Sequence, residues 1–242
     1  MKTEPEFQIS LSQSTLRKFL WFLIGLDIFL TLMYVLVFVV APNFPWGPLD
    51  HWFDLDQDMS LPSWFASIQY LFVGIPTLIS ATKSNGKNLV SKRFLYLIGA
   101  TFIFLALDEA LGIHEQISVA TEKFDLSWLK IVAFKGGHGV WIFVYALLGI
   151  ILLILTYRDL VTIWSSFRKE TLYVLIGGSL LVLGEVLVEV VSYLFLRTSA
   201  AGILYNLEVT IEEFFALIGV SLIFYGVLLL LAKLKFTAQP EK

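Results

Sequence analysis

The stretch FLYLIGATFIFLALDEALGIHE, residues 94–115, decides the class of this protein. Residues 94–107 carry no charge, and a helix of about 20 mainly apolar residues crosses the hydrocarbon core of a bilayer. The run lacks the polar–apolar alternation of a barrel strand, so a spanning strand is excluded. The stretch therefore predicts a membrane helix that carries carboxylates and a histidine at one end.

The rest of the chain has the same apolar character. Of its 242 residues 57% are hydrophobic and 15% are charged, and the mean hydropathy is +0.80. Soluble domains carry about 25% charged residues. We predict an all-α integral membrane bundle of six helices in a single domain, residues 1–242. The expected spans are about 18–41, 63–82, 94–118, 134–156, 172–196 and 208–232.

Lysine and arginine predict the orientation of the bundle. With a cytoplasmic N-terminus, thirteen of the 17 basic residues fall in inner segments and four in outer segments. Cytoplasmic loops of membrane proteins carry such an excess. The even number of spans then places the C-terminus in the cytoplasm as well.

Composition also limits the partners and the chemistry. The chain has no cysteine, which excludes disulfides and thiolate chemistry, and its net charge of −3 argues against nucleic acid. We expect the lipid bilayer to be the partner of this chain. The expected location is the plasma membrane, which in a bacterium is the inner membrane. The oligomeric state stays open.

Acidic residues of three expected spans lie at one depth. Spans three and five run outward and carry their acids late, whereas span six runs inward and carries its acids early. Spans three, five and six contain no Lys or Arg to neutralise these acids. A charged acid at mid-bilayer costs about 2.5–3.5 kcal/mol. Protonation, a water-filled outer cavity or a bound cation would relieve this cost.

Helical periodicity predicts which of these residues share a face. At about 100° per residue, Asp108, Gly112 and Glu115 share one face of span three, and His114 points about 120° away from Asp108. Two further stripes pair acids with small residues, which allow helices to pack closely. They comprise Gly178, Glu185, Glu189 and Ser192 in span five, and Glu208, Glu212, Ala216 and Gly219 in span six.

Carboxylates combined with imidazoles are typical ligands of di-iron, di-manganese and zinc sites. We therefore expect a divalent metal, iron, manganese or zinc, in the outer half. The expected ligands are Asp108, Glu109, His114, Glu115, His138, Glu185, Glu189 and Glu212. Such a site would suit a metal-dependent membrane enzyme that acts on a lipid or quinone.

The outer segment before span two adds further acids. Asp54, Asp56 and Asp58 match the first three ligand positions of a calcium loop, but Met59 and Phe65 stand where the glycine and the last glutamate belong. We expect turns stabilised by aspartate side chains instead, with Ser60 or Ser63 capping span two. Residues expected to line or cover the access to the site are His51, Asp54, Asp56, Asp58, Glu208 and Glu213.

Three other functions fit the same residues. The acids could be relay groups of a proton or cation transport or sensing protein. His114 and His138 could be axial ligands of a b-type haem. The acids could also only hydrogen-bond helices together in an assembly or scaffold subunit.

The motifs together resemble a family of bacterial polytopic membrane proteins without an established activity. The resemblance rests on DLDQDMSLPSWFAS at 54–67, on LDEALGIHE at 107–115, with its DE-x4-HE spacing, and on EVTIEEFFALIG at 208–219. It covers most of the chain. It implies a shared site and no particular reaction.

Overall fold

The structure is a computed structural model that describes residues 6–7, 12–84, 89–122, 140–191, 202–234 and 236–237. Six helices in these residues are long and apolar enough to cross a membrane, which confirms the expected all-α membrane fold. They cover Gln13–Val40, Leu61–Lys83, Lys92–Leu111, Val140–Ser166, Arg168–Val188 and Ile203–Lys233.

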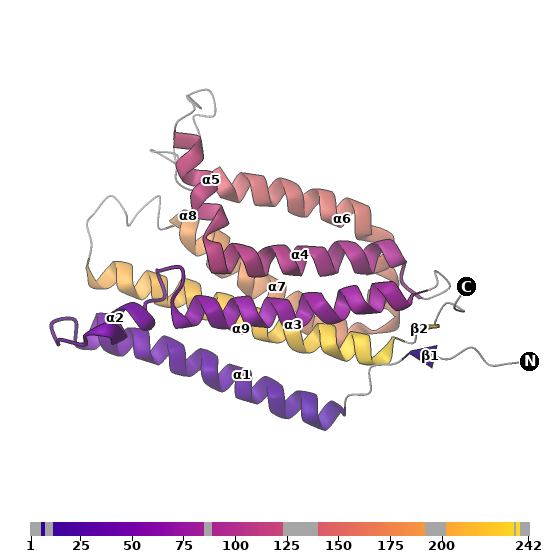
Figure 1. Cartoon of the computed structure of the whole chain (residues 1–242), viewed down its shortest axis with the longest axis horizontal. Helices are drawn as coiled ribbons and strands as arrows, with labels where there is room; N and C mark the ends of the chain where they lie inside the picture. Colours follow the sequence, from indigo (N-terminus) through magenta and orange to yellow (C-terminus); the bar gives the residue numbers. More distant parts are fainter. Residues whose placement is uncertain are drawn as a thin grey trace, which may run out of the picture.

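The spans are built from the following elements (Figure 1). The first span is α1 (Gln13–Tyr34) followed by a π-helical segment, η1 (Val35–Val40), and the next three are α3 (Leu61–Lys83), α4 (Lys92–Leu111) and α6 (Val140–Ser166). The fifth is α7 (Arg168–Val182) with a second π-helical segment, η3 (Leu183–Val188), and α8 (Glu189–Val191), and the sixth is α9 (Ile203–Lys233). The remaining elements are α2 (Pro48–Trp52), α5 (Ile113–Glu122) and the antiparallel pair β1 (Glu6–Phe7) and β2 (Phe236–Thr237).

Serine caps set the beginnings of two spans. Ser60 Oγ accepts a hydrogen bond from the Ser63 amide at 3.4 Å, which confirms Ser60 as the cap of span two. Ser91 caps α4 in the same way, through the Phe94 amide at 3.0 Å. The Asp159 carboxylate of α6 accepts hydrogen bonds from both the amide and the hydroxyl of Ser91, so the start of α4 is tied to α6.

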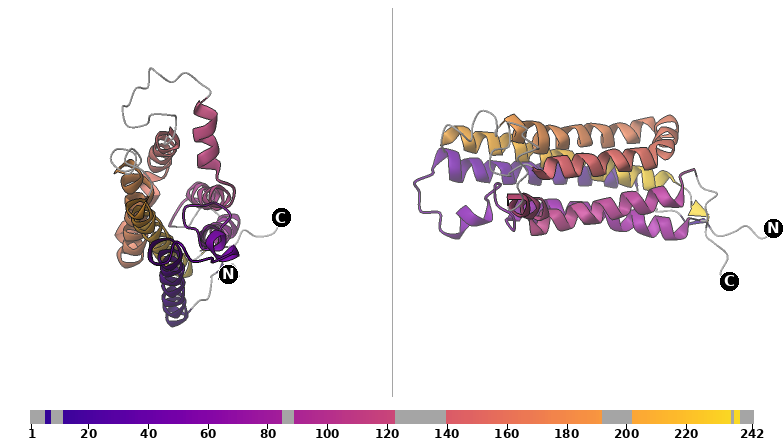
Figure 2. Two further views of the ribbon diagram at one scale, coloured as in Figure 1. Left: turned by 90° about the vertical axis from the view of Figure 1, so that its left-hand side faces the viewer. Right: turned by 90° about the horizontal axis from the view of Figure 1, so that it is seen from above.

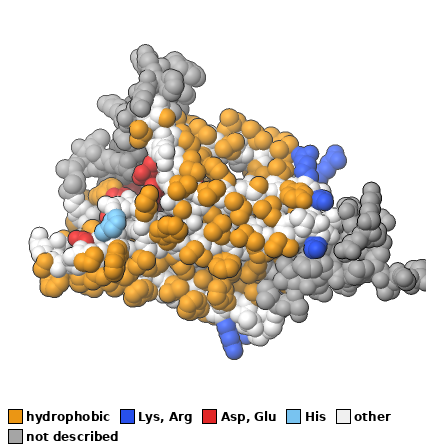
Figure 3. Space-filling view, in the orientation of Figure 1, with side chains coloured by type: hydrophobic (Ala, Val, Ile, Leu, Met, Phe, Trp, Pro, Cys, Tyr) orange, Lys and Arg blue, Asp and Glu red, His pale blue; other side chains and the backbone are white. Residues whose placement is uncertain are grey.

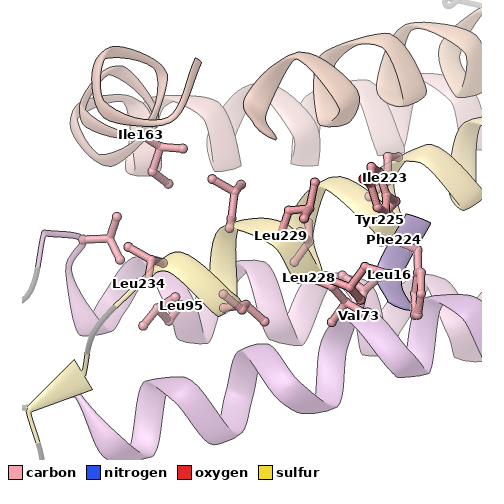
Figure 4. Close-up of a cluster of buried hydrophobic side chains, with 14 of the residues drawn as sticks. Leu16, Val73, Leu95, Ile163, Ile223, Phe224, Tyr225, Leu228, Leu229 and Leu234 are labelled. Carbon is pink, nitrogen blue, oxygen red and sulfur yellow. The ribbon is translucent and has the colours of Figure 1, made fainter. Parts of the chain in front are cut away.

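Helix α9 forms the centre of the bundle (Figure 2). Burial covers 72% of its most apolar stretch, against 17% for α6, and it packs on α1, α3 and α7. Its residues Ile223–Leu231 supply much of a buried apolar cluster that also takes side chains from α1, α3 and α4 (Figure 4). The outer surfaces of α6 and α7 remain apolar and exposed, as expected for contact with lipid.

Glycines bring α7 against α9. A Cβ on Gly177 would lie 2.5 Å from the Gly219 carbonyl oxygen, and a Cβ on Gly184 would lie 2.5 Å from the Glu212 carbonyl oxygen. Nothing lies within 4 Å of such an atom on Gly178. The stripe that faces α9 therefore contains Gly177 and Gly184, and our assignment of Gly178 to the packed face was wrong by one residue.

The third span is shorter than expected. Helix α4 ends at Leu111 because Gly112 takes a left-handed conformation, with φ 58° and ψ 46°. The following residues form α5, a separate helix that turns away from the bundle (Figure 1). The expected continuation of the span to residue 118 was therefore wrong.

Charges separate to the two ends of the bundle (Figure 3). We call the end with Lys83, Lys92, Arg93, Arg158 and Lys233 the basic end, and the opposite end, which holds Asp58, Asp108 and Glu115, the acidic end. The described parts near both termini, β1 and β2, pair at the basic end (Figure 1). The cytoplasmic location of this end remains a prediction from the positive-inside rule.

Candidate functional site

The site is built around the break at Gly112. The left-handed residue ends α4, where the Gly112 amide donates to the Asp108 carbonyl at 2.8 Å. Asp108 Oδ1 then accepts a hydrogen bond from the His114 amide at 2.8 Å, so this carboxylate caps the first turn of α5. One aspartate thus links the last turn of the span to the helix that leaves it.

The His114 ring lies against the same carboxylate. Its Nδ1 is 3.2 Å from Asp108 Oδ1, which contradicts the expected separation of these two side chains around the helix. The expectation failed because the helix does not continue through Gly112. Burial lowers the pKa of His114, but the hydrogen bond to Asp108 and the charges of Asp108, Glu185 and Asp58 raise it to about 9. The ring is therefore an imidazolium at neutral pH.

A pair of carboxyl groups meets over Gly112. A Cβ on this glycine would overlap Asp58 Oδ2 and would lie 3.6 Å from Glu115 Oε2. The Asp58 and Glu115 side chains share a hydrogen bond. Burial, the charges of Glu115 and Asp108, and this hydrogen bond raise the pKa of Asp58 to about 6, against the opposing effect of His114. Asp58, expected only to cover the site, belongs to its centre.

Glu109 and Glu185 form the deeper part of the acidic end. Glu109 lies within electrostatic reach of Glu185, His114, Asp58 and Asp108. Glu185 belongs to η3, and π-helical turns within helices often occur at functional sites. Glu185 therefore lies within electrostatic reach of Glu109 and His114, while a common ligand site for these residues stays a prediction.

A second set of contacts fastens the loop before α3. Tyr205 of α9 donates its hydroxyl to the Asp56 carboxylate, at 2.9 and 2.8 Å from the two oxygens. The Asp56 amide donates to Asp54 Oδ1 at 3.1 Å, which confirms the expected aspartate turn. Burial raises the pKa of Asp54. Glu213 lies within reach of Tyr34 in the same region.

The remaining expected residues lie apart from Gly112. His51 is exposed and bonded to Gln57 at 2.9 Å, and it lies within electrostatic reach of Asp54. Glu208 is buried near the start of α9, and Glu212 packs its backbone against Gly184. Met59 adopts a positive φ of 64°, the conformation that favours the glycine expected here in a calcium loop. Its neighbour Asp58 nevertheless turns toward Gly112.

The structure describes only part of the expected metal site. No three His, Asp or Glu side chains within the described residues are arranged to hold a metal ion. His138 lies outside the described residues, as does the side chain of Glu189. The metal site therefore stays a prediction.

Tyrosines were missed by the sequence analysis. Tyr70 of α3 is buried within reach of Glu109 and Glu185, and Tyr145 of α6 lies within reach of Asp108. Tyr205 bonds Asp56, as described above. The available signal was their position in the outer halves of the spans, level with the acids, where a phenol can donate to a carboxylate.

Comparison with known proteins gives a family and no activity. No curated protein and no solved structure matches the chain. A family model described as a domain of unknown function, DUF8692, matches residues 24–231. This match extends from the first span to the last and includes every residue of the acidic end described above, so the chain belongs to the DUF8692 family.

Proposed function

We propose that this protein binds protons at its acidic end and uses them in transport or sensing at a membrane. The observation that carries the proposal is the meeting of the Asp58 and Glu115 carboxyl groups over Gly112, where they are close enough to share a hydrogen bond. Two carboxyl groups share a hydrogen bond only when one of them keeps its proton, because an ionised carboxylate has no donor. The pair is thus a proton-binding unit.

The surroundings favour a proton on Asp58, whose pKa is raised to about 6. Asp108 and His114 already form an ion pair beside it, so the imidazolium is partly neutralised and does not hold both carboxyl groups ionised. Asp58 comes from a loop and Glu115 from α5, whereas Asp108 belongs to a span. Loss of the shared proton would leave two carboxylates that repel each other, and would therefore weaken the contact between the loop and the bundle.

A titration of the purified full-length protein tests the proposal. We expect the wild type to release more protons than Asp58→Asn between about pH 5 and about pH 7, the range around the pKa of Asp58. Asp50→Asn is the matched control, since Asp50 lies on the nearby α2 and bonds only the adjacent His51 amide in the contacts described. Equal proton release by the wild type and Asp58→Asn would refute the proposal.

Reconstitution distinguishes the two uses of the proton. In liposomes with a trapped pH indicator, a transporter would change the internal pH after an external pH jump, and Glu115→Gln would abolish the change. A sensor would leave the internal pH constant, while the exposure of residues 53–60 to hydrogen exchange would change with external pH.

A metal ion is the second candidate ligand. The observation that favours it is the approach of two carboxylates, Asp58 and Glu115, to one point over Gly112, because a cation there would relieve their repulsion. A membrane enzyme acting on a lipid or quinone would belong with this alternative. Elemental analysis of the purified protein tests it: stoichiometric iron, manganese or zinc that is lost in Glu115→Gln would replace the proton proposal.

A further inference from the structure

Asp27 lies halfway along α1 with its side chain fully buried. Ser221 Oγ of α9 is 2.7 Å from Asp27 Oδ2 and 3.2 Å from Gln69 Oε1 of α3. All three side chains are at most 2% exposed. We call Asp27, Gln69 and Ser221 the Asp27 triad; it joins three spans and shares no residue with the acidic end.

The triad has no basic neighbour on the helices that form it. The sequence contains no Lys or Arg between residues 19 and 82 or between residues 203 and 232. Within the described residues, the side chains that act on the Asp27 carboxyl group are those of Ser221 and Gln69, which are both neutral. An ionised carboxylate would thus be buried among neutral groups, a costly arrangement within a membrane.

Two atoms of the triad identify what is missing. Within the described residues, Asp27 Oδ1 and Gln69 Nε2 are buried without a hydrogen-bond partner. Ser221 has a single hydroxyl proton, so it cannot donate to both of the acceptors it contacts. A buried polar atom without a partner destabilises the folded protein, so two of them in one site call for a ligand.

One proton satisfies the whole triad. If the Gln69 amide is turned end for end, its nitrogen donates to Ser221 Oγ, and Ser221 donates to Asp27 Oδ2. Two oxygens then remain, Asp27 Oδ1 and Gln69 Oε1. Gln69 lies near enough to act on the Asp27 carboxyl group, so a small rotation of the two side chains would let a proton on Asp27 Oδ1 donate to Gln69 Oε1 and close a ring of three hydrogen bonds.

The geometry points to the Asp27 triad as a second proton-binding site, placed midway across the membrane on α1, α3 and α9. Its ligand is a single proton held between Asp27 and Gln69. The inference stands on the geometry of the triad and does not require the acidic end to bind protons. Tyr70, the residue after Gln69, lies within reach of Glu109 and Glu185, so α3 passes between the two sites.

Infrared spectroscopy of the full-length protein in liposomes tests this inference. A protonated carboxyl group gives a C=O stretching band separate from that of a carboxylate. We expect Asp27→Asn to lose one such band at neutral pH, and Ser221→Ala to keep the band but shift it, because its hydrogen bond is gone. Asp159→Asn is the control, since this carboxylate already accepts two hydrogen bonds from Ser91 and its loss leaves the band unchanged.

The asparagine substitution also tests the ring itself. The amide introduced by Asp27→Asn can donate to Gln69 and accept from Ser221 as a protonated aspartate does, so this variant is expected to fold with an unchanged unfolding temperature. Glu115→Gln leaves the Asp27 band in place whether or not the acidic end binds protons.

Two results would overturn the inference. If the wild type and Asp27→Asn show identical bands, Asp27 is ionised. If the band disappears when sodium chloride replaces choline chloride at constant pH, the triad binds a monovalent cation in place of a proton.

Discussion

Gly112 determines the acidic end through its conformation and its missing side chain. Its φ of 58° ends α4 and leaves the His114 amide free to donate to Asp108, and its open face receives the Asp58 carboxyl group. Any other residue would meet both a strained backbone and an occupied space. The site therefore depends on a residue that carries no functional group.

The first prediction concerns Gly112→Ala. Left-handed backbone at a residue with a Cβ costs about 1–2 kcal/mol, and the methyl group would also displace Asp58. We expect the free energy of unfolding to fall by at least this amount and the proton release assigned to Asp58 to shift to lower pH. Gly149→Ala is the matched control: it has open space and a helical backbone, so chemical denaturation should show equal or greater stability.

The second prediction concerns pH and has two steps of the same sign. Burial and nearby carboxylates raise the pKa of Asp58 from 3.8 to about 6, so its contribution to stability is complete below 3.8 and is lost as pH rises through about 6. The pKa of His114 rises from 6.5 to about 9, so its contribution is complete below 6.5 and is lost as pH rises through about 9.

Thermal unfolding across this range measures both steps. Relative to each variant, the wild type should lose stability as pH rises from 3.8 to about 6, and again as it rises from 6.5 to about 9. Asp58→Asn should remove only the first step, and His114→Gln only the second. A single step that neither substitution alters would contradict the assignment.

At the scale of helices, the close contact between α7 and α9 is held by glycine on both sides. Our third prediction is that Gly219→Val weakens this contact, because a Cβ at 219 would lie 2.7 Å from the Gly177 carbonyl oxygen. Overpacking typically costs about 1–3 kcal/mol. Gly178→Val faces open space and should be tolerated, as unfolding in increasing denaturant would show. If both variants lost similar amounts of unfolding free energy, glycine would matter here for its backbone conformation and not for the close helix contact.

The same helices show where sequence reasoning reached its limit. Composition and length located the spans, since hydropathy depends on residues that are contiguous in the chain. The predicted side-chain directions of Asp108 and His114 assumed one continuous helix. They were wrong because Gly112 ends that helix before His114. The register of Gly177 against Gly178 also failed, because which face of a helix meets its neighbour is decided by packing. The contact of Asp58 with Glu115 joins a loop to a helix that lies beyond the next two spans, which no local pattern encodes.

The separation of charge between the two ends leads to the fourth prediction, which concerns the whole molecule. The chain has no cysteine, so single cysteines report the side of the membrane directly. In intact cells, we expect a membrane-impermeant maleimide to label Asp50→Cys at the acidic end. Lys169→Cys, at the start of α7, should react only after permeabilisation. The reverse labelling pattern would place the acidic end in the cytoplasm, and the proposed site would then bind protons from the cytoplasmic side.

The central position of α9 has a consequence for biosynthesis. Ser221 follows Asp27 by 194 residues, so at a ribosomal rate of about 5–20 residues per second it appears roughly 10–40 s later. Until then Asp27 and Gln69 have entered the membrane without the hydroxyl group that joins them. Asp27 of the nascent chain therefore lacks its hydrogen bond from Ser221 until α9 has been synthesised and inserted. During this interval we expect the partly assembled bundle to be most susceptible to binding by insertion chaperones and to cleavage by membrane proteases.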